Sequence, residues 1–436
     1  MNLSATDKTI LKIIKAEEKR QKTTLQMIPS ENFTSKAVME AVGSVLMNKY
    51  TEGYAGKRYY QGAKLYDDIE KLAIERAKKV FGVEYVNVQP YSGSPANMAV
   101  YFTLLEKQDK VLGLSLPFGG HLTHGHPEVT FLGRYFNTIQ YRTDAQGFLD
   151  YTEIERLALE HKPKIIISGA TAYPRLIDFE KIGKIADMIG AFHMADISHI
   201  AGLVAANVHP SPVDFAHIVT STTHKTLRGP RGAMIMITKK GIDKDSDLPS
   251  KIDKAVFPGL QGGPHNNTTA GIAVALLEAQ SQEFKKYAKQ IVLNAQALSN
   301  TLKAFGFKLL TDGTDNHLIL IDLSNKGVDG WCTAWALEFA GIIVNRNSVP
   351  FDKNSAFYPS GIRLGTPALT TQGLKETHMK VIAELINRTV EACIPYLGQA
   401  ELDNATRKNF KMKISKDKSI KAVAKEVSGL LKTLVP

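Results

Sequence analysis

The sequence predicts an α/β protein, with a mostly parallel central sheet in a large domain and a smaller α+β domain at the C-terminal end. Short apolar runs of strand length alternate with helical patterns between residues 65 and 237, and this alternation is typical of a parallel sheet covered by helices. The pattern changes after about residue 285, where a long helical stretch leads into further short apolar runs. The length of 436 residues corresponds to two or three domains.

The large domain is expected to begin after an N-terminal arm. Residues 1–26 predict a polar helix that packs on a neighbour through a thin apolar stripe. This stripe consists of Leu3, Ile10, Ile13 and Ile14. From Leu65 to Val80, apolar residues recur every three or four positions, which predicts a helix facing a core, and Gly82 closes it. Six strands are then expected, at residues 85–88, 111–114, 164–168, 191–196, 218–221 and 233–237.

The small domain is expected to begin with a long helix over residues 284–305. Three short apolar runs follow as strands, at residues 307–310, 317–323 and 341–344, before a closing helical region. We therefore expect three parts in the chain: a helical arm over 1–26, a large domain over 27–284 and a small domain over 285–436.

Composition narrows the class of protein and its location. The start of the chain lacks the apolar core of a signal peptide, and the longest apolar runs are far below the roughly 20 residues that span a bilayer. The two cysteines, Cys332 and Cys393, do not have metal-ligand spacing. We therefore expect a cytoplasmic protein with reduced thiols, without a membrane partner and without a bound metal.

The net charge of +11, from 54 basic and 43 acidic residues, is consistent with anionic ligands. Much of the excess lies near the C-terminus, between Arg407 and Lys425, with few aromatic residues among the cations. A solvated helix face explains this region better than a nucleic-acid site, so nucleic acid is not expected as a partner. An RNA-binding protein that uses the basic C-terminal region is kept as a remote alternative.

The first candidate site lies where a predicted strand gives way to a helix. Ser92, Gly93 and Ser94 follow the strand, and Pro95 suits the first helical position. The N–H groups and hydroxyls at a helix N-terminus attract anions, phosphate included. A simple serine N-cap is the alternative. The phosphate-binding patterns GxGxxG and GxxxxGK[ST] do not occur, which argues against a dinucleotide or a nucleoside triphosphate.

The second candidate is Asp196, which ends a predicted strand and is followed by Ser198 and His199. Ligands of parallel sheets bind at the carboxyl ends of the strands, so these polar groups face the expected site. A carboxylate there can keep the ring nitrogen of a cofactor protonated. A loop or capping aspartate, or a ligand of Mg²⁺, is the alternative.

The third candidate is Lys225, which follows another strand within the segment Ser221–Gly232. It lies among hydroxyls, the imidazole of His224 and the guanidinium groups of Arg228 and Arg231. Nearby cations and burial lower the pKa of a lysine and provide the free amine that attacks a carbonyl. A basic surface loop or a non-covalent phosphate clamp is the alternative. A phosphate cradle, a strand-end acid and an activated lysine together are what pyridoxal phosphate requires.

Long blocks of the sequence also resemble one family of pyridoxal-phosphate enzymes. The matching blocks include Pro29–Ser35, Lys49–Tyr54, Gly56–Tyr60, Gly119–Gly125, Thr222–Gly232, Phe257–Pro264 and Gly361–Thr371. Through these blocks, residues 27–385 resemble serine hydroxymethyltransferase, which is a pyridoxal-phosphate-dependent transferase of fold type I. The resemblance implies pyridoxal 5'-phosphate as cofactor and tetrahydrofolate as co-substrate.

The resemblance implies roles for individual residues at the cofactor. Lys225 corresponds to the lysine that forms an imine with the cofactor, Asp196 to the partner of the pyridine nitrogen and His121 to the histidine that stacks on the ring. The expected phosphate cup is Ser92, Gly93 and Ser94, with Gly262 and Gly263 of the partner subunit. Thr171 and His199 correspond to positions near the phenolic oxygen, and Thr222 and His224 complete the expected cofactor site.

The resemblance also implies the substrate site. Arg363, assisted by Ser30, corresponds to the group that binds the substrate carboxylate, and a planar guanidinium suits that contact. Tyr50 and Glu52 correspond to a pair that reaches the site from the partner subunit, with Tyr60 nearby and Glu52 as the proton-transfer group. The residues expected to line the folate site are Leu116, Gly120, Leu122, Asn347, Ser355, Ala356 and Phe357. The expected catalytic residues are Lys225, Glu52, Tyr50, Tyr60, His224 and Asp196.

The implied activity is the reversible transfer of the hydroxymethyl carbon of L-serine to tetrahydrofolate, giving glycine and 5,10-methylenetetrahydrofolate. The implied assembly is a homodimer or a dimer of dimers with shared active sites. The alternative among enzymes is a folate-independent pyridoxal-phosphate aldolase that acts on threonine or another β-hydroxy amino acid. The folate-lining residues and Glu52 distinguish these two activities.

Overall fold

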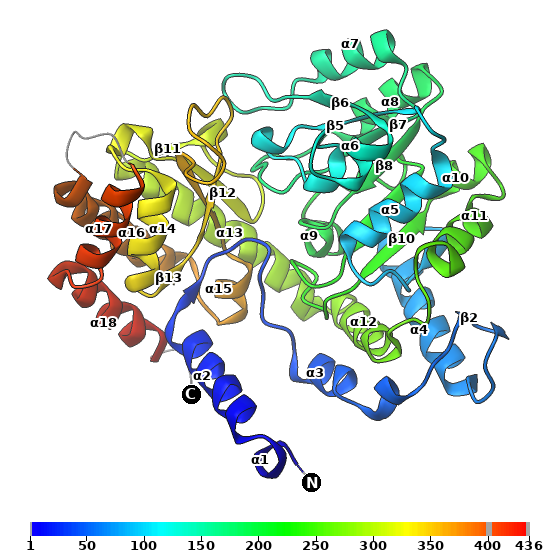
Figure 1. The fold of residues 1–436 in the computed structure, drawn as a ribbon, viewed down its shortest axis with the longest axis horizontal. Coiled ribbons are helices and arrows are strands. Elements are labelled where there is room, and N and C mark those ends of the chain that lie inside the picture. The colour runs from blue at the N-terminus through cyan, green and yellow to red at the C-terminus, as the bar shows by residue number, and fades with distance from the viewer. Residues whose placement is uncertain (1, 398–402, 433–436) are drawn as a thin grey trace. The chain divides into compact units, whose positions relative to one another are not determined.

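A computed structural model describes residues 2–397 and 403–432, and the internal contacts of the chain divide it into two units (Figure 1). Unit 2 comprises Ser30–Val292 and Asp315–His317, and unit 1 comprises the described residues of 1–29, 293–314 and 318–436. The contacts change unit near residues 29 and 292, whereas the division expected from the sequence falls at residues 26 and 284 and stays a prediction.

A seven-stranded sheet forms the centre of unit 2, in the order β4-β10-β9-β8-β7-β5-β6. Its strands are β4 (Tyr85–Asn87), β5 (Lys110–Leu114), β6 (Asn137–Tyr141), β7 (Ile165–Ser168), β8 (Phe192–Asp196), β9 (Ile218–Thr222) and β10 (Ala233–Ile237). Neighbours from β9 to β6 pair in parallel, while β10 runs antiparallel to both β9 and β4. The six strands expected from the sequence are present, and the prediction of a mostly parallel sheet is confirmed.

Strand β6 was not predicted from the sequence. It lies at the edge of the sheet, and most of its residues are only partly buried. An edge strand that solvent reaches does not need the continuous apolar run that marks a central strand of a parallel sheet. With the polar residues Asn137 and Gln140 in it, β6 therefore lacks the apolar run by which the other strands were predicted.

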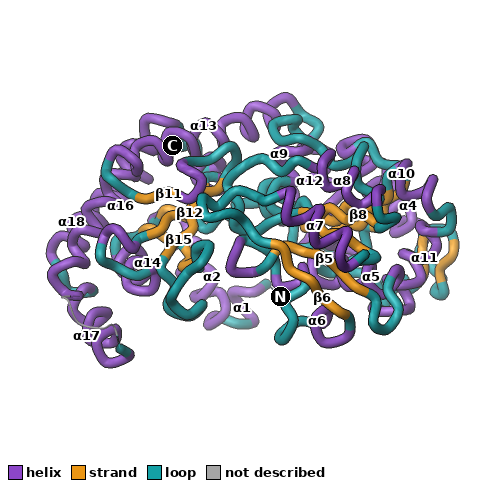
Figure 2. Tube along the Cα trace, turned by 90° about the horizontal axis from the view of Figure 1, so that it is seen from above, coloured by secondary structure: helices purple, strands orange, loops and turns teal. Residues whose placement is uncertain are grey.

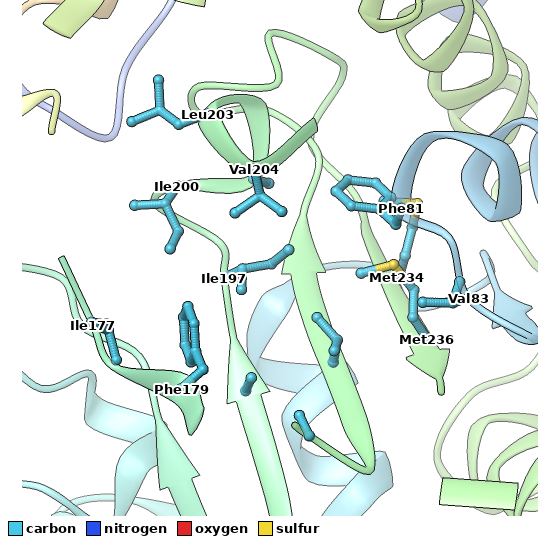
Figure 3. Packing of buried hydrophobic residues seen from close by; sticks show 14 of the residues in the cluster. Phe81, Val83, Ile177, Phe179, Ile197, Ile200, Leu203, Val204, Met234 and Met236 are labelled. Carbon is cyan, nitrogen blue, oxygen red and sulfur yellow. The ribbon is translucent and has the colours of Figure 1, made fainter. Parts of the chain in front are cut away.

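Two hydrophobic cores cover the two faces of this sheet, because successive side chains of a strand point to opposite faces. On β7, Ile166 belongs to one core, while Ile165 and Ile167 belong to the other. The first core also holds Met234 and Met236 of β10, which Figure 3 shows near Phe81 and Val83. Helices lie on both sides of the strands in Figure 2. The result is a three-layer α/β arrangement, in which helices cover both faces of the sheet and the ends of the strands are left uncovered.

The helices of unit 2 follow the sheet connections, and the predicted helix from Leu65 is α4, which ends at Gly82 in the left-handed conformation (φ 70°). The α-helices are α3 (Lys36–Val42), α4 (Lys64–Phe81), α5 (Gly93–Leu104), α6 (Phe131–Tyr135), α7 (Tyr151–His161), α8 (Phe179–Met188), α9 (Ala201–Ala205), α10 (Lys239–Lys244), α11 (Leu248–Lys254) and α12 (Asn266–Ala279). Shorter elements are η1 (Val45–Asn48), β2 (Gly53–Tyr54), β3 (Lys57–Arg58), η2 (Leu116–Phe118), η3 (Leu122–His124) and η4 (Ala255–Leu260). Helix α13 (Gln282–Ala304) continues from unit 2 into unit 1.

Unit 1 has a four-stranded antiparallel sheet, in the order β11-β12-β15-β14, and a short parallel pair, β1 with β13. The strands are β1 (Leu25–Gln26), β11 (Lys308–Leu309), β12 (Leu318–Asp322), β13 (Ile342–Ile343), β14 (Asn345–Asn347) and β15 (Gly361–Gly365). The remaining elements are α1 (Leu3–Thr6), α2 (Lys8–Thr23), η5 (Leu310–Asp312), η6 (Ser324–Lys326), α14 (Gly330–Phe339), α15 (Pro367–Thr371), α16 (Glu376–Leu397), α17 (Asn404–Ile414) and α18 (Lys418–Lys432). These strands and helices confirm an α+β unit.

The N-terminal arm differs in detail from the single helix expected over residues 1–26, of which Met1 lies outside the described residues. Asp7 accepts hydrogen bonds from Thr9 N and Ile10 N and starts a second helix, so α1 and α2 are separate. The residues after α2 pair with β13. The predicted apolar stripe is exposed in this chain; its members are Leu3, Ile10, Ile13 and Ile14.

The basic C-terminal region forms two amphipathic helices. Phe410 and Ile414 of α17, and Val423 and Val427 of α18, are buried in the core of unit 1. Most of the lysines and arginines expected on a solvated face lie on the outer sides of these helices. Among the described residues, no helix combines the length and the apolar character needed to cross a bilayer.

Helix α7 provides a matched test of the core of unit 2. Leu157 is 8% exposed and belongs to the first core, whereas Leu159 on the same helix is 47% exposed. Leu157→Ala is expected to lower the free energy of unfolding by about 2–5 kcal/mol through the cavity it leaves, and Leu159→Ala by about 0.5 kcal/mol or less. Urea-induced unfolding measures both, and equal midpoints for the two variants would contradict this packing.

Candidate active site

A cavity of about 160 Å³ lies at the carboxyl ends of the parallel strands of unit 2. Asp196 ends β8, Thr222 ends β9, and Ser92 directly precedes α5. The wall consists of Ser92, Gly93, Ser94, His121, His124, Ala170, Thr171, Asp196, Ser198, His199, Thr222, His224, Lys225 and Arg231. Every residue expected from the sequence at the cofactor lies in this wall, except Gly262 and Gly263. The strand-end rule therefore located this cavity from the sequence.

The N-terminus of α5 forms one side of the cavity. Ser92 is its N-cap, with an extended backbone and without a side-chain capping hydrogen bond. A Cβ atom at Gly93 would lie 2.7 Å from Cγ2 of Thr222, so only glycine keeps this space open. Pro95 is the third helical residue rather than the first, as the sequence had suggested. Its missing N–H is harmless at either position, because the first N–H groups of a helix lack intrahelical partners.

Asp196 is buried and its carboxylate accepts several hydrogen bonds. Oδ2 accepts from Asn97 Nδ2 at 2.9 Å and lies 3.1 Å from His124 Nε2, and Oδ1 accepts from Ser198 N at 3.0 Å. Burial by itself raises the pKa of Asp196, but the hydrogen bond and charge of His124, with smaller contributions from His121 and Asn97, lower it well below its usual range. Asp196 is therefore ionised and able to pair with a protonated ring nitrogen.

The segment that carries Lys225 is a tight turn. Thr223 Oγ1 donates to Pro230 O at 2.6 Å and Gly229 N donates to Thr223 O at 2.7 Å, which closes the loop around Lys225. Arg228 adopts a positive φ of 63° within it. Asn32 Nδ2 donates to the carbonyl oxygen of Lys225 at 3.0 Å and holds the turn from a distant segment.

His224 is the neighbour of Lys225 in the cavity. Burial, with smaller contributions from the charges of Arg231 and Lys225, lowers the pKa of His224 to about 3. The imidazole is therefore neutral at physiological pH. Within the described part of the chain, its buried Nδ1 atom has no hydrogen-bond partner. A buried polar atom of this kind in a cavity wall is available to a ligand atom.

Three further predicted residues complete the wall. Thr171 Oγ1 donates to Gly120 O at 2.8 Å, which joins the loop after β7 to the loop after β5. His199 Nδ1 lies 3.3 Å from His317 Nε2, and the two rings stack with centroids 5.5 Å apart. His121 Nδ1 lies 2.7 Å from Thr123 Oγ1.

The residues expected from the partner subunit form a separate group in unit 2. The rings of Tyr50 and Tyr60 have centroids 5.5 Å apart. A Cβ at Gly262 would lie 3.4 Å from Glu52 Oε1, and one at Gly263 would lie 2.8 Å from Cε1 of Tyr50. Tyr50 is 56% exposed. These five residues lie together, but none of them lines the cavity of the same chain.

The residues expected at the substrate divide between the two units. In unit 2 are Ser30, Leu116, Gly120 and Leu122, and in unit 1 are Asn347, Ser355, Ala356, Phe357 and Arg363. Arg363 on β15 is half-buried. Desolvation lowers its pKa to about 10, and its Nε donates to Asn345 Oδ1 at 3.2 Å. The guanidinium stays charged at neutral pH. Phe357 is exposed and lies 4.3 Å from the Arg346 guanidinium carbon, measured to the ring centroid.

Three residues of the site were missed by reasoning from the sequence. They are Asn97, Thr123 and His124: Asn97 and His124 contact Asp196, and Thr123 contacts Asn97. His124 lies within a block quoted for the family resemblance, but a function was not expected for it. Asn97 is one turn beyond the start of α5, on the side that faces β8. This position could have indicated a role for Asn97, because a polar side chain one turn into this helix faces the ends of the strands.

The chemical groups of the cavity fit pyridoxal phosphate. The helix N-terminus beside Gly93 suits the phosphate, the ionised Asp196 suits the ring nitrogen, and Lys225 suits the aldehyde. The Nδ1 atom of His224, which has no hydrogen-bond partner among the residues that the structure describes, provides a further contact point. The cavity therefore contains a suitable partner for each polar part of this cofactor.

Comparison with known proteins also indicates a pyridoxal-phosphate enzyme. A sequence model of the serine hydroxymethyltransferase family matches residues 3–386. The serine hydroxymethyltransferase of Desulfotalea psychrophila is 56% identical over 388 residues, which cover 89% of this chain and 89% of the relative. That of Acidothermus cellulolyticus is 55% identical over 392 residues (89% and 90%). The probable serine hydroxymethyltransferase of Rickettsia bellii is 54% identical over 385 residues (88% and 90%).

The fold and the cavity define a pyridoxal-phosphate-dependent enzyme of fold type I. Within that class, the chain belongs to the serine hydroxymethyltransferase family. The expected fold class, the cofactor and the co-substrate tetrahydrofolate are confirmed through this membership. The roles of individual residues stay predictions.

Gly93 allows a direct test of the phosphate cradle. In Gly93→Ala, the new Cβ meets Thr222 and fills the space at the start of α5. Pyridoxal phosphate is expected to bind about tenfold more weakly, or 1.4 kcal/mol. The close contact with Thr222 is also expected to lower folding stability, which urea-induced unfolding measures separately. Titration of the apoenzyme with the cofactor measures this affinity. The matched control is Gly429→Ala in α18, where a Cβ meets nothing within 4 Å; unchanged affinity in Gly93→Ala would contradict the assignment.

Proposed function

We propose that this chain transfers the hydroxymethyl carbon of L-serine to tetrahydrofolate, reversibly, and releases glycine and 5,10-methylenetetrahydrofolate. The observation that carries the proposal is the meeting of Asp196, Lys225 and the N-terminus of α5 in one cavity, in a chain more than half identical to named serine hydroxymethyltransferases. Bound pyridoxal phosphate supplies an electron sink for bond cleavage at the amino acid.

The groups of the cavity hold the cofactor and its protons. Asp196 keeps the ring nitrogen protonated, because the carboxylate is ionised and buried. Lys225, in the wall of the same cavity, would hold the cofactor through its aldehyde group. Ser92, Gly93 and Ser94 bind the phosphate, and Thr222 supports that contact from the end of β9. The neutral imidazole of His224 donates or accepts a hydrogen bond without adding charge.

The amino-acid substrate is recognised through its carboxylate. Arg363 is proposed as the two-point partner of that carboxylate, with Ser30 as the second contact, since a guanidinium presents paired donors in one plane. The half-buried Arg363 retains its charge at neutral pH, which supports this role. Leu116, Gly120, Leu122, Asn347, Ser355, Ala356 and Phe357 are proposed to line the folate site.

Glu52 is proposed to move the proton that accompanies transfer of the hydroxymethyl carbon, with Tyr50 and Tyr60 positioned beside it. In this chain, these residues and Gly262 and Gly263 lie outside the wall of the cavity. We infer that they serve the site of a partner subunit, in a homodimer or a dimer of dimers. The exposed ring of Tyr50 supports the inference, because a partner subunit can reach it.

Replacement of Lys225 tests the covalent role of the lysine. Lys225→Ala is expected to lose the yellow absorbance of the lysine-bound cofactor and to reduce turnover by about 10²–10⁴-fold. Lys239→Ala, at an exposed lysine paired with Asp243, is the control and should retain both. Absorbance spectra and serine cleavage assays measure the two effects. Full turnover by Lys225→Ala would refute the assignment.

Dependence on folate distinguishes the transferase from a folate-independent aldolase. Glycine and then tetrahydrofolate are added to the yellow holoenzyme, and the absorbance spectrum is followed. A long-wavelength band that develops only when both are present is expected, because removal of the glycine α-proton is then coupled to folate binding. A protein that cleaves β-hydroxy amino acids at the same rate without tetrahydrofolate would be an aldolase instead.

Mixed subunits test the shared active site. Lys225→Ala and Glu52→Gln chains are each expected to be inactive, but dimers that contain one chain of each kind have one site with both native residues. Random re-association of equal amounts then restores about a quarter of the native activity, since half of the dimers are mixed and half of their sites are native. Mixtures that remain inactive, while gel filtration shows exchange of subunits, would place Glu52 and Lys225 in the same chain's site.

A further inference from the structure

A chain of hydrogen bonds, buried at Asn97 and partly buried at Thr123, connects Asp196 to His121 through residues to which the proposed reaction does not assign a role. Asn97 binds both Asp196 and Thr123, and Thr123 binds His121. We propose that Asn97 and Thr123 are positioning residues. They hold the imidazole of His121 in its neutral, Nε2-protonated form beside the cofactor ring, an inference that rests on the proposed function.

The protonation of His121 follows from its partners. The backbone N–H of Thr123 donates to His121 Nδ1 at 3.2 Å. A backbone amide is only a donor, so Nδ1 is an acceptor and carries no proton. The proton of the neutral ring is therefore on Nε2. The hydroxyl of Thr123 lies 2.7 Å from the same Nδ1 atom and is its second partner.

The direction of the Thr123 hydroxyl is determined by Asn97. Asn97 Nδ2 donates to Thr123 Oγ1 at 2.8 Å and occupies an acceptor position of that oxygen. The hydroxyl hydrogen is then free to point at His121 Nδ1, which is an acceptor. Thr123 thus accepts from Asn97 and donates to His121.

The amide of Asn97 is oriented in turn by Asp196. The ionised carboxylate only accepts hydrogen bonds, so the atom 2.9 Å from Asp196 Oδ2 is the nitrogen of Asn97. Asn97 Oδ1, on the other side, accepts from Thr220 Oγ1 at 2.8 Å. Every hydrogen bond from Thr220 to His121 therefore points the same way, and the charge of Asp196 sets the direction.

The direction of these hydrogen bonds matters because the ring nitrogen of the cofactor would be protonated and positively charged. Protonation of His121 at Nδ1 would break the hydrogen bond from the Thr123 amide, turn its hydroxyl and place a cation beside the protonated ring. The charged or titratable groups around His121 are His124 in the same turn, Asp196 on β8, and His199, His224, Lys225 and Arg231 on the other walls. Arg231 is a cation that adds to the unfavourable potential.

The test compares Thr123→Val, which removes the hydroxyl at nearly constant volume, with Thr123→Ser, which restores it. Thr103→Val is the matched control, because Thr103 Oγ1 donates to the carbonyl of Ala99 in its own helix, and Thr103 does not line the cavity. Nitrogen-15 shifts of His121, assigned with His121→Gln, report the tautomer with and without pyridoxal phosphate. Cofactor affinity is measured at pH 6 and pH 8.

Wild type and Thr103→Val are expected to have His121 protonated on Nε2 at both pH values. In Thr123→Val, protonation of Nδ1 is expected at pH 6, and the ratio of cofactor affinities between pH 8 and pH 6 should rise about fivefold, the effect of one hydrogen bond. Thr123→Ser should restore both properties.

The proposal is overturned by an Nδ1-protonated neutral His121 in the wild type, which needs no variant to be folded. It is also overturned if Thr123→Val weakens binding equally at both pH values, which would indicate only a structural role. A wild-type protein that does not bind pyridoxal phosphate would refute the proposed function, while the tautomer measured without cofactor would still decide the role of Thr123.

Discussion

The buried carboxylate of Asp196 is the interaction on which the arrangement of the site depends. Burial of an ionised group costs several kcal/mol unless hydrogen-bond donors replace water. The donors here come from η3, from α5 and from the backbone after β8, as His124, Asn97 and Ser198 N. These segments must therefore meet at one point, and that requirement places the start of α5 and the loop of His121 around the end of β8.

The turn that carries Lys225 is held in place by hydrogen bonds to its backbone rather than by a buried charge. Its turn includes a residue of positive φ, Arg228, and is closed by hydrogen bonds of Thr223. Asn32 and Thr34, far away in the chain, bind the carbonyl oxygens of Lys225 and Arg228. The lysine is thus anchored at its backbone while its side chain is left to act in the cavity. Pre-organisation of this kind reduces the entropy lost when the site is assembled.

The difference between the predicted and the missed site residues has a physical cause. Asp196 and Lys225 follow apolar strands directly, so their place at the ligand-binding edge is a local property of the sequence. Asn97 and Thr123 act through partners that only the pairing of β8 and β9 and the docking of α5 bring near. A polar residue in a helix or a loop does not indicate which distant group it will bind, so these two residues were not predicted.

The sequence by itself determined the central strands, the helix ending at Gly82, the positions of the acid and the lysine, and the family. Short-range periodicity encodes these elements, because the side chains of a strand or a helix repeat every two or 3.6 residues. Tertiary structure alone decided the order of the strands, the edge strand β6, the separation of Tyr50 and Glu52 from the cavity, and the tautomer of His121. Each of these depends on contacts between residues far apart in the chain, which no local pattern specifies.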